Sequence, residues 1–149
     1  MKQEDKEQDG IAILHQYLLT ISQHEVFQTF FSRLSPYGIT PGQYGVLSCL
    51  WKNGPTTPKE IARALRLENS TVSGILDRMQ KQDLIDRVVD PNNRRSILVI
   101  ATPSAMAMKD DVLKAVDELN VEILQDFTPQ EKDALMESLR RIGRIDEEE

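Results

Sequence analysis

Apolar residues recur at three- and four-residue intervals over most of the chain, and proline- and glycine-containing breaks separate these stretches. The longest such pattern predicts a first helix over residues 9–34, which the segment Ser35–Gly38 ends. Its apolar positions are Ile11, Leu14, Leu18, Ile21, Phe27, Phe30, Phe31 and Leu34. A chain of 149 residues with this pattern is expected to form one mostly helical domain, spanning residues 1–149.

Four Thr-Pro pairs mark where further helices begin. Threonine is a good N-cap, and proline fits the first helical position because its missing N–H would have no partner there. The four threonines are Thr40, Thr57, Thr102 and Thr128. Three of them complete a capping box with Gln43, Glu60 and Glu131. The pairs predict helices over residues 41–52, 58–65 and 103–126, and a last helix from residue 128 with three inward positions, Leu135, Leu139 and Ile142.

The middle of the chain predicts a helix-turn-helix followed by a hairpin. Residues 58–65 and 69–82 have the pattern of two short helices joined by three residues. Two extended segments, 84–89 and 96–101, flank Asp90–Asn93, which has the composition of a turn. We therefore predict a mostly α fold with a small β-hairpin wing. Its winged helix-turn-helix lobe spans residues 40–101, and Arg94 and Arg95 lie at the tip of the hairpin.

The start of the predicted helix 69–82 carries the candidate base-reading groups. In a helix-turn-helix the second helix enters the major groove of DNA, and its N-terminal residues reach base edges. Four small polar residues occupy that end, namely Asn69, Ser70, Thr71 and Ser73, while Val72, Ile75 and Leu76 are expected to face the core. Hydroxyl and amide groups both donate to and accept from bases and phosphates. The alternative is that this polar end only caps a buried helix.

The hairpin arginines shift the balance towards DNA binding. A loop that exposes adjacent arginines beside a recognition helix can insert a guanidinium into the narrow, electronegative minor groove. The alternative for Arg94 and Arg95 is an ion pair with Asp90 or another acidic residue.

The charge distribution agrees with one basic module on an acidic body. The formal net charge is −6, but residues 52–95 hold nine Lys and Arg against six acidic residues, a local balance of +3 that leaves −9 for the rest. Such a module can still bind phosphate. The candidate phosphate contacts are Lys59, Arg63, Arg66, Arg78 and Lys81.

The chain resembles the multiple-antibiotic-resistance regulators, the MarR family, over essentially its whole length. The resemblance is carried, in order, by Ile39-Thr40-Pro41-Gly42-Gln43-Tyr44, Glu60-Ile61-Ala62 with Leu65, Ser70-Thr71-Val72-Ser73, Leu76-Asp77-Arg78-Met79, Leu84-Ile85, and Asp90-Pro91-Asn92-Asn93-Arg94-Arg95 with Val99 and Thr102. It implies a DNA-binding transcriptional regulator, usually a repressor. It also implies a homodimer whose terminal helices, here 9–34 and 103–144, interlock so that two winged lobes bind a palindromic operator. Small aromatic or anionic effectors, or thiol oxidation, often release members of this family.

The resemblance also assigns roles in the wing. Arg95 best matches the wing arginine of the family, and the resemblance implies that Asp90 is its ion-pair partner, while either Arg94 or Arg95 can enter the minor groove. The chain departs from the family pattern at four places. Asp83 replaces a glycine and must tolerate a left-handed backbone, and Glu68 replaces a capping serine. Asn93 replaces an aspartate that braces the wing, and Pro103-Ser104-Ala105 replaces a stretch that ends in glycine.

The remaining reactive residues predict little further chemistry. Cys49 has no neighbouring basic residue in sequence, so an inert core thiol is expected rather than a peroxide sensor. His15 and His24 lie on opposite faces of one helix, which argues against a metal site, and no cofactor is expected. No phosphate-binding loop, HExxH motif or nucleophile elbow is present, so an enzyme is not expected.

Three expectations complete the picture. The aromatic residues near the first break could line an effector pocket, although core packing explains them as well: Phe27, Phe30, Phe31, Tyr37, Tyr44 and Trp51. With no leader pattern and no long apolar run, the protein is expected in the cytoplasm and not in a membrane. The rival interpretation is a winged-helix protein-interaction module that has lost DNA binding.

Overall fold

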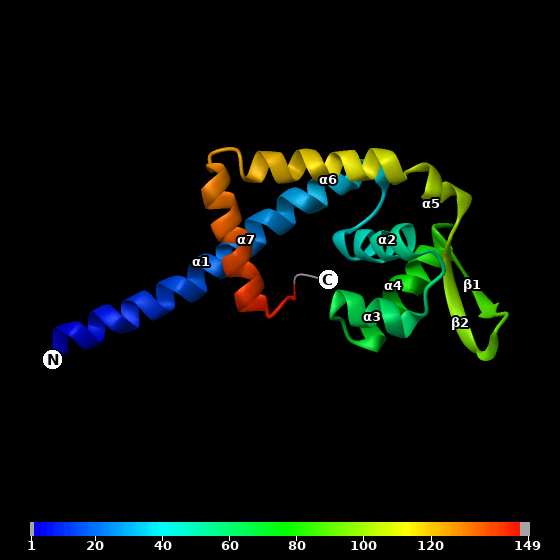
Figure 1. Cartoon of the computed structure of the whole chain (residues 1–149), viewed down its shortest axis with the longest axis horizontal. Coiled ribbons are helices and arrows are strands. Elements are labelled where there is room, and N and C mark those ends of the chain that lie inside the picture. Colours follow the sequence, from blue (N-terminus) through cyan, green and yellow to red (C-terminus); the bar gives the residue numbers. More distant parts are fainter. Residues whose placement is uncertain (1, 147–149) are drawn as a thin grey trace.

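The computed structural model describes residues 2–146, with side-chain environments described from residue 15 onwards. In chain order the elements are α1 Lys2–Leu34, the short 3-10 turn η1 Ser35–Tyr37, α2 Pro41–Asn53, α3 Pro58–Leu65, α4 Asn69–Lys81, β1 Ile85–Asp90, β2 Asn93–Ala101, α5 Pro103–Ala107, α6 Lys109–Ile123 and α7 Pro129–Gly143. Figure 1 shows α2, α3, α4 and the β1–β2 hairpin grouped at one end, with the start of α1 at the other. The fold is mostly helical with a two-stranded antiparallel wing, as predicted.

All four Thr-Pro pairs start helices as predicted. The side-chain oxygen of Thr40 accepts from the Gln43 N–H, and the Gln43 side chain accepts in turn from the Thr40 N–H. The same reciprocal box closes at Thr57 and Thr128, whereas Thr102 caps α5 without a box partner. Each box satisfies two backbone donors that a helix start would otherwise leave without partners.

One hydrophobic core holds together the winged helix-turn-helix lobe of residues 40–101, the reading lobe. Leu47 of α2, Ile61 of α3 and Leu76 of α4 are fully buried or nearly so. Val99 of β2 is also fully buried, and its backbone exchanges two hydrogen bonds with Thr56 in an isolated antiparallel β-bridge. The base of the wing is therefore fixed to the helices that it flanks.

The predicted helix 103–126 is broken at Met108, which corrects the sequence prediction. α5 contacts β2, and after Met108 the chain changes direction so that α6 runs beside α1 (Figure 1). No proline or glycine marks this break. The directions of α5 and α6 are set instead by their different packing partners, β2 for α5 and α1 for α6. The first helix also begins earlier than predicted, at Lys2, since the preceding Lys, Gln and Glu residues favour a helix.

Apolar positions on α1 and α7 are exposed in the single chain, although on α7 the sequence pattern predicted that Leu139 and Ile142 face inward. On α1 the exposed side chains include Leu18, Ile21, Phe27 and Phe31. On α7, Leu139 is 42% exposed and Ile142 is 63% exposed. The predicted positions Ile11 and Leu14 lie outside the described side chains. These helices therefore keep a hydrophobic stripe that the single chain does not cover.

No helix within residues 2–146 combines the length and the apolar composition that crossing a membrane requires.

Candidate DNA-binding interface

The start of α4 presents four polar side chains to solvent. Asn69, Ser70, Thr71 and Ser73 are all exposed, while three apolar residues of the same helix, Val72, Ile75 and Leu76, are buried as predicted. None of the four polar side chains forms a hydrogen bond with another residue in the described part of the chain. Their donors and acceptors therefore remain available to bases or phosphates.

Glu68 occupies the N-cap position of α4 but does not cap it. Its backbone is extended, with φ −65° and ψ 145°, and its side chain accepts no cap hydrogen bond. The exposed first N–H groups of α4 and the helix dipole together favour an anion at this end. The Glu68 carboxylate lies beside that end and opposes an incoming phosphate.

The wing carries its arginines in a β-bulge. Val89 pairs with Ile97 and Asp90 pairs with Asn93, so the residues between Asn93 and Ile97 have no partners on β1. Arg94 and Arg95 both belong to this bulge, inside β2 rather than in a turn before it, and both are exposed. A bulge changes the direction of the side chains that it carries, so it can turn both guanidinium groups away from the sheet.

The predicted ion pair between Asp90 and Arg95 does not form. The Asp90 carboxylate instead accepts from the Asn92 N–H at 2.9 Å, which closes the turn. The Asn93 side chain accepts from the Arg95 N–H at 3.2 Å, so Asn93 does brace the wing. Arg94 and Arg95 form no ion pair with any residue that the structure describes.

Arg87 is a residue of this region whose role the sequence analysis missed. Its guanidinium pairs with the Asp77 carboxylate, with Nη2 and Oδ1 2.5 Å apart, and this links β1 of the wing to α4. The Arg87 side chain is only 26% exposed, and its Nε is buried without a hydrogen-bond partner. The pair fixes the wing relative to the recognition helix. Charge counts alone could not reveal it, because the two residues belong to different elements.

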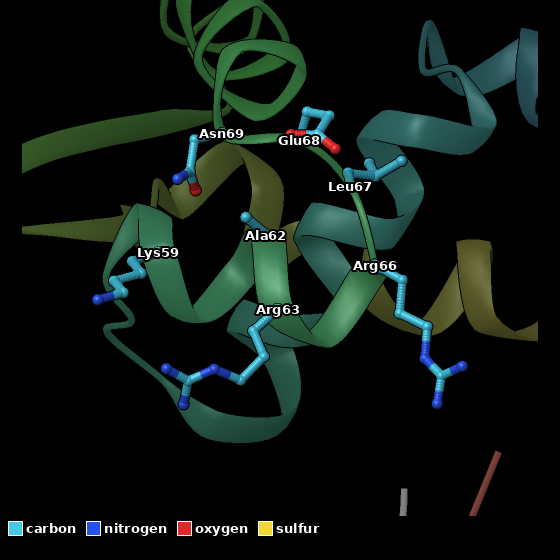
Figure 2. Close-up of a pocket in the computed structure, with 7 residues that line it drawn as sticks. All are labelled: Lys59, Ala62, Arg63, Arg66, Leu67, Glu68 and Asn69. Atoms are coloured by element: carbon cyan, nitrogen blue, oxygen red, sulfur yellow. The ribbon is translucent and has the colours of Figure 1, made fainter. Parts of the chain in front are cut away.

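The basic residues around α3 fall into two groups. An open hollow of about 330 Å³ lies between α3 and the start of α4, lined by Lys59, Ala62, Arg63, Arg66, Leu67, Glu68 and Asn69. Figure 2 shows Lys59 and Arg63 on one side of α3, whereas Arg66 points away from them. Arg78 and Lys81 are exposed on α4. The predicted phosphate contacts thus do not all face one way.

The Arg66 side chain already has partners within the chain. Its Nη1 donates to the carbonyl oxygen of Gly143 at 2.8 Å, and its Nη2 donates to that of Arg144 at 2.9 Å. These carbonyls lie at the C-terminal end of α7. Arg66 therefore joins the reading lobe to the last helix.

The other reactive groups of the chain support structure. Cys49 is buried, and burial raises the pKa of its thiol even though the charge of Lys52 lowers it. Phe30 and Tyr44 meet edge to face with ring centroids 5.2 Å apart, and both pack against the core together with Tyr37 and Trp51. The packing interpretation therefore explains these four aromatic residues, while Phe27 and Phe31 face solvent.

Comparisons with known proteins agree with this arrangement. A family profile described as MarR matches residues 39–97. The multiple antibiotic resistance protein MarR of Salmonella typhimurium is 30% identical over 110 residues, which cover 73% of this chain and 76% of that protein.

Two solved structures share the fold. A mutant MarR from E. coli complexed with operator DNA has a TM-score of 0.82 at 24% identity and covers 88% of this chain and 94% of that one. Bordetella bronchiseptica BpsR, whose DNA binding is regulated by 6-hydroxynicotinic acid, has a TM-score of 0.81 at 23% identity, with 88% and 94% covered.

Proposed function

Because this chain belongs to the MarR family of DNA-binding transcriptional regulators, which are not enzymes, we propose that it is a homodimeric repressor that binds a palindromic operator. The observation that carries the proposal is the exposure of two groups of side chains whose elements, α4 and β2, lie at the same end of the molecule in Figure 1. One group is the polar start of α4, and the other is the arginine-bearing bulge of β2. The side chains of Asn69, Ser70, Thr71 and Ser73, and those of Arg94 and Arg95, form no hydrogen bond or ion pair with the residues that the structure describes.

Each group has a distinct role in the proposed complex. Asn69, Ser70, Thr71 and Ser73 read base edges in the major groove, where hydroxyl and amide groups discriminate between base pairs. Arg94 and Arg95 enter the adjacent minor groove, whose negative potential attracts guanidinium groups. Four exposed cations complete the interface by contacting phosphates: Lys59, Arg63, Arg78 and Lys81.

The uncovered apolar stripes on α1 and α7 support the dimer. Exposed side chains such as Phe27, Phe31 and Ile142 lie on the elements expected to interlock, namely residues 9–34 and 103–144. Burying apolar surface contributes about 25 cal/mol per Å², so a second copy of the chain gains stability by covering these stripes. A two-fold dimer then places two recognition helices about one DNA turn apart.

Selection of bound duplexes from a random pool tests the proposed function. The full-length protein should enrich an inverted repeat whose half-sites are centred about 10 base pairs apart. The variant Ser70→Ala/Thr71→Ala serves as the comparison, because it removes two hydroxyls from the exposed side of α4 and leaves the buried side intact. It should bind nonspecific duplex as before and lose the enriched sequence. Enrichment of no sequence by the unaltered protein would contradict operator binding.

We further propose that a small aromatic or anionic effector lowers the affinity for DNA. The support is BpsR, a protein of the same fold whose DNA binding is regulated by 6-hydroxynicotinic acid. An effector acts only if it binds the DNA-competent and incompetent conformations with different affinity. Titration of the operator complex with 6-hydroxynicotinic acid, with benzoate as a second probe, tests this. An unchanged dissociation constant would exclude release by these two compounds.

A further inference from the structure

Two helices of this chain end in the same strained way. Arg66 after α3 has φ 54° and Arg144 after α7 has φ 51°, the left-handed region that glycine usually occupies at helix ends. The next N–H bonds back across each end, from Leu67 to the Ala62 carbonyl at 3.0 Å and from Ile145 to the Arg140 carbonyl at 2.9 Å. A left-handed backbone is sterically unfavourable for a residue that carries a Cβ.

The side chain of Arg66 uses its position at the end of α3 to reach the end of α7. Its planar fork donates one hydrogen bond to each of two successive carbonyls, those of Gly143 and Arg144, at 2.8 and 2.9 Å. Carbonyls in the last turn of a helix lack partners within the helix and carry a partial negative charge. The guanidinium therefore satisfies acceptors at the end of α7 and places a cation at the negative end of its dipole.

This contact crosses a boundary that matters for operator binding. α3 belongs to the reading lobe, and α7 belongs to the proposed dimerisation region. Figure 1 shows the C-terminal end of α7 directed towards α3. We propose that Arg66 is a positioning residue that holds the reading lobe against α7 and so sets the spacing of the two recognition helices, rather than a phosphate contact. The proposal rests on the homodimer of the proposed function.

One further observation and one chemical argument agree with this role. In Figure 2 the Arg66 side chain points away from Lys59 and Arg63. A guanidinium that spans two carbonyls also resists replacement by lysine, whose single ammonium lacks the planar fork. Lysine would, in contrast, still serve as a phosphate contact, because that role needs only a positive charge close to the backbone.

The distance between recognition helices in the DNA-free dimer tests the proposal directly. A spin label is attached to Gln80→Cys on the exposed face of α4 in a Cys49→Ala background, and the label-to-label distance distribution is measured by electron–electron double resonance. We expect a narrow distance distribution for the protein that retains Arg66. Arg66→Gln and Arg66→Lys should both broaden or shift it, and Arg63→Gln, the matched control one turn earlier on α3, should not.

The outcomes separate this inference from the proposed function. Identical distributions for all proteins would overturn the positioning role and leave the dimer intact. Absence of dipolar coupling in every protein would overturn the dimer, and the positioning role of Arg66 with it. Thermal unfolding checks that each variant is folded. If Arg66→Gln unfolds, Arg66→Gly replaces it, because glycine keeps the left-handed helix end while it removes the side chain.

Salt dependence of nonspecific duplex binding provides a second readout that a purely structural role would not move. Each phosphate contact contributes about 0.9 to the slope of log K against log salt, so loss of one contact from each subunit of a dimer lowers the slope by about 1.8. We expect this decrease for Arg63→Gln and no decrease for Arg66→Gln. A decrease of about 1.8 for Arg66→Gln would assign the residue to the phosphate interface and overturn the proposal.

Discussion

Replacing Gly74 by alanine is predicted to stabilise the protein and to weaken its binding to DNA. Gly74 lies in the middle of α4, where glycine costs about 0.5–1 kcal/mol relative to alanine. A Cβ added at this position would meet only the Arg78 Nη1, at 4.0 Å, which is an ordinary contact. The substitution should therefore stabilise α4 by the full difference in helix propensity between glycine and alanine. For a protein of this size, 1 kcal/mol raises the melting temperature by about 2–4 °C.

The effect on DNA binding has the opposite sign because of where the new methyl group lies. Ser70, Gly74 and Arg78 are spaced four residues apart and form one row along α4, and the first and last of them are exposed. If this row faces the DNA, the methyl group prevents close approach of the backbone to a phosphate. The Gly74 N–H is already bonded within the helix, so the contacts at risk are those of the neighbouring Ser70 and Arg78 side chains. Loss of one charge-assisted hydrogen bond from these side chains would reduce affinity about tenfold.

Thermal unfolding and operator titration, performed on the same variants, check the two halves of this prediction. Gly42→Ala on α2 is the matched control, because an added Cβ there meets Ile75 Cδ1 at 3.4 Å and lies outside the proposed DNA interface. The control should leave affinity unchanged. Equal affinities for Gly74→Ala and the unaltered protein would refute the assignment of this row to the DNA face. A lower melting temperature for Gly74→Ala would refute the packing argument.

Four further predictions concern the wing, the start of α4, the dimer contact on α7 and the buried thiol. Substitution of both Arg94 and Arg95 by alanine should weaken operator binding markedly and lower its salt slope, and unchanged binding in a filter or fluorescence assay would remove the wing from the interface. Glu68→Ser should tighten binding to nonspecific duplex, more at low salt than at high salt because surface charges are screened; an unchanged affinity at low salt would place Glu68 away from DNA. Ile142→Glu should shift the protein towards monomer in sedimentation velocity, and a dimer of unaltered strength would exclude this part of α7 from the interface. Cys49 should react with iodoacetamide slowly in the native protein and quickly in denaturant, since burial raises its pKa; rapid native alkylation would contradict the inert-thiol assignment.

Local rules predicted much of the reading lobe. The Thr-Pro pairs located the helix starts, because capping depends on residues only three positions apart. The pattern of Val72, Ile75 and Leu76 identified the buried side of α4 for the same reason, since helical periodicity is a property of neighbours. Asp83 was expected in a left-handed backbone and has φ 59°.

Long-range contacts decided what the sequence analysis missed. The break at Met108 arises because α5 packs on β2 while α6 packs on α1, and no local residue encodes that change of partner. The wing arginines are in a bulge rather than paired with Asp90, because the register of β1 against β2 fixes which residues remain unpaired. Exposure of Ile142 was also unpredictable from periodicity, which identifies an apolar face but not what covers it.

The sequence by itself thus determined the helices, the wing and the polar start of α4, because each depends on residues close together in the chain. Only the tertiary structure decided the direction of the basic side chains. Lys59, Arg63 and Arg66 looked equivalent in sequence, yet Arg66 donates to carbonyls 77 and 78 residues away at the end of α7. A charged side chain acts on the nearest group of opposite polarity, and which group that is depends on how the chain folds back on itself.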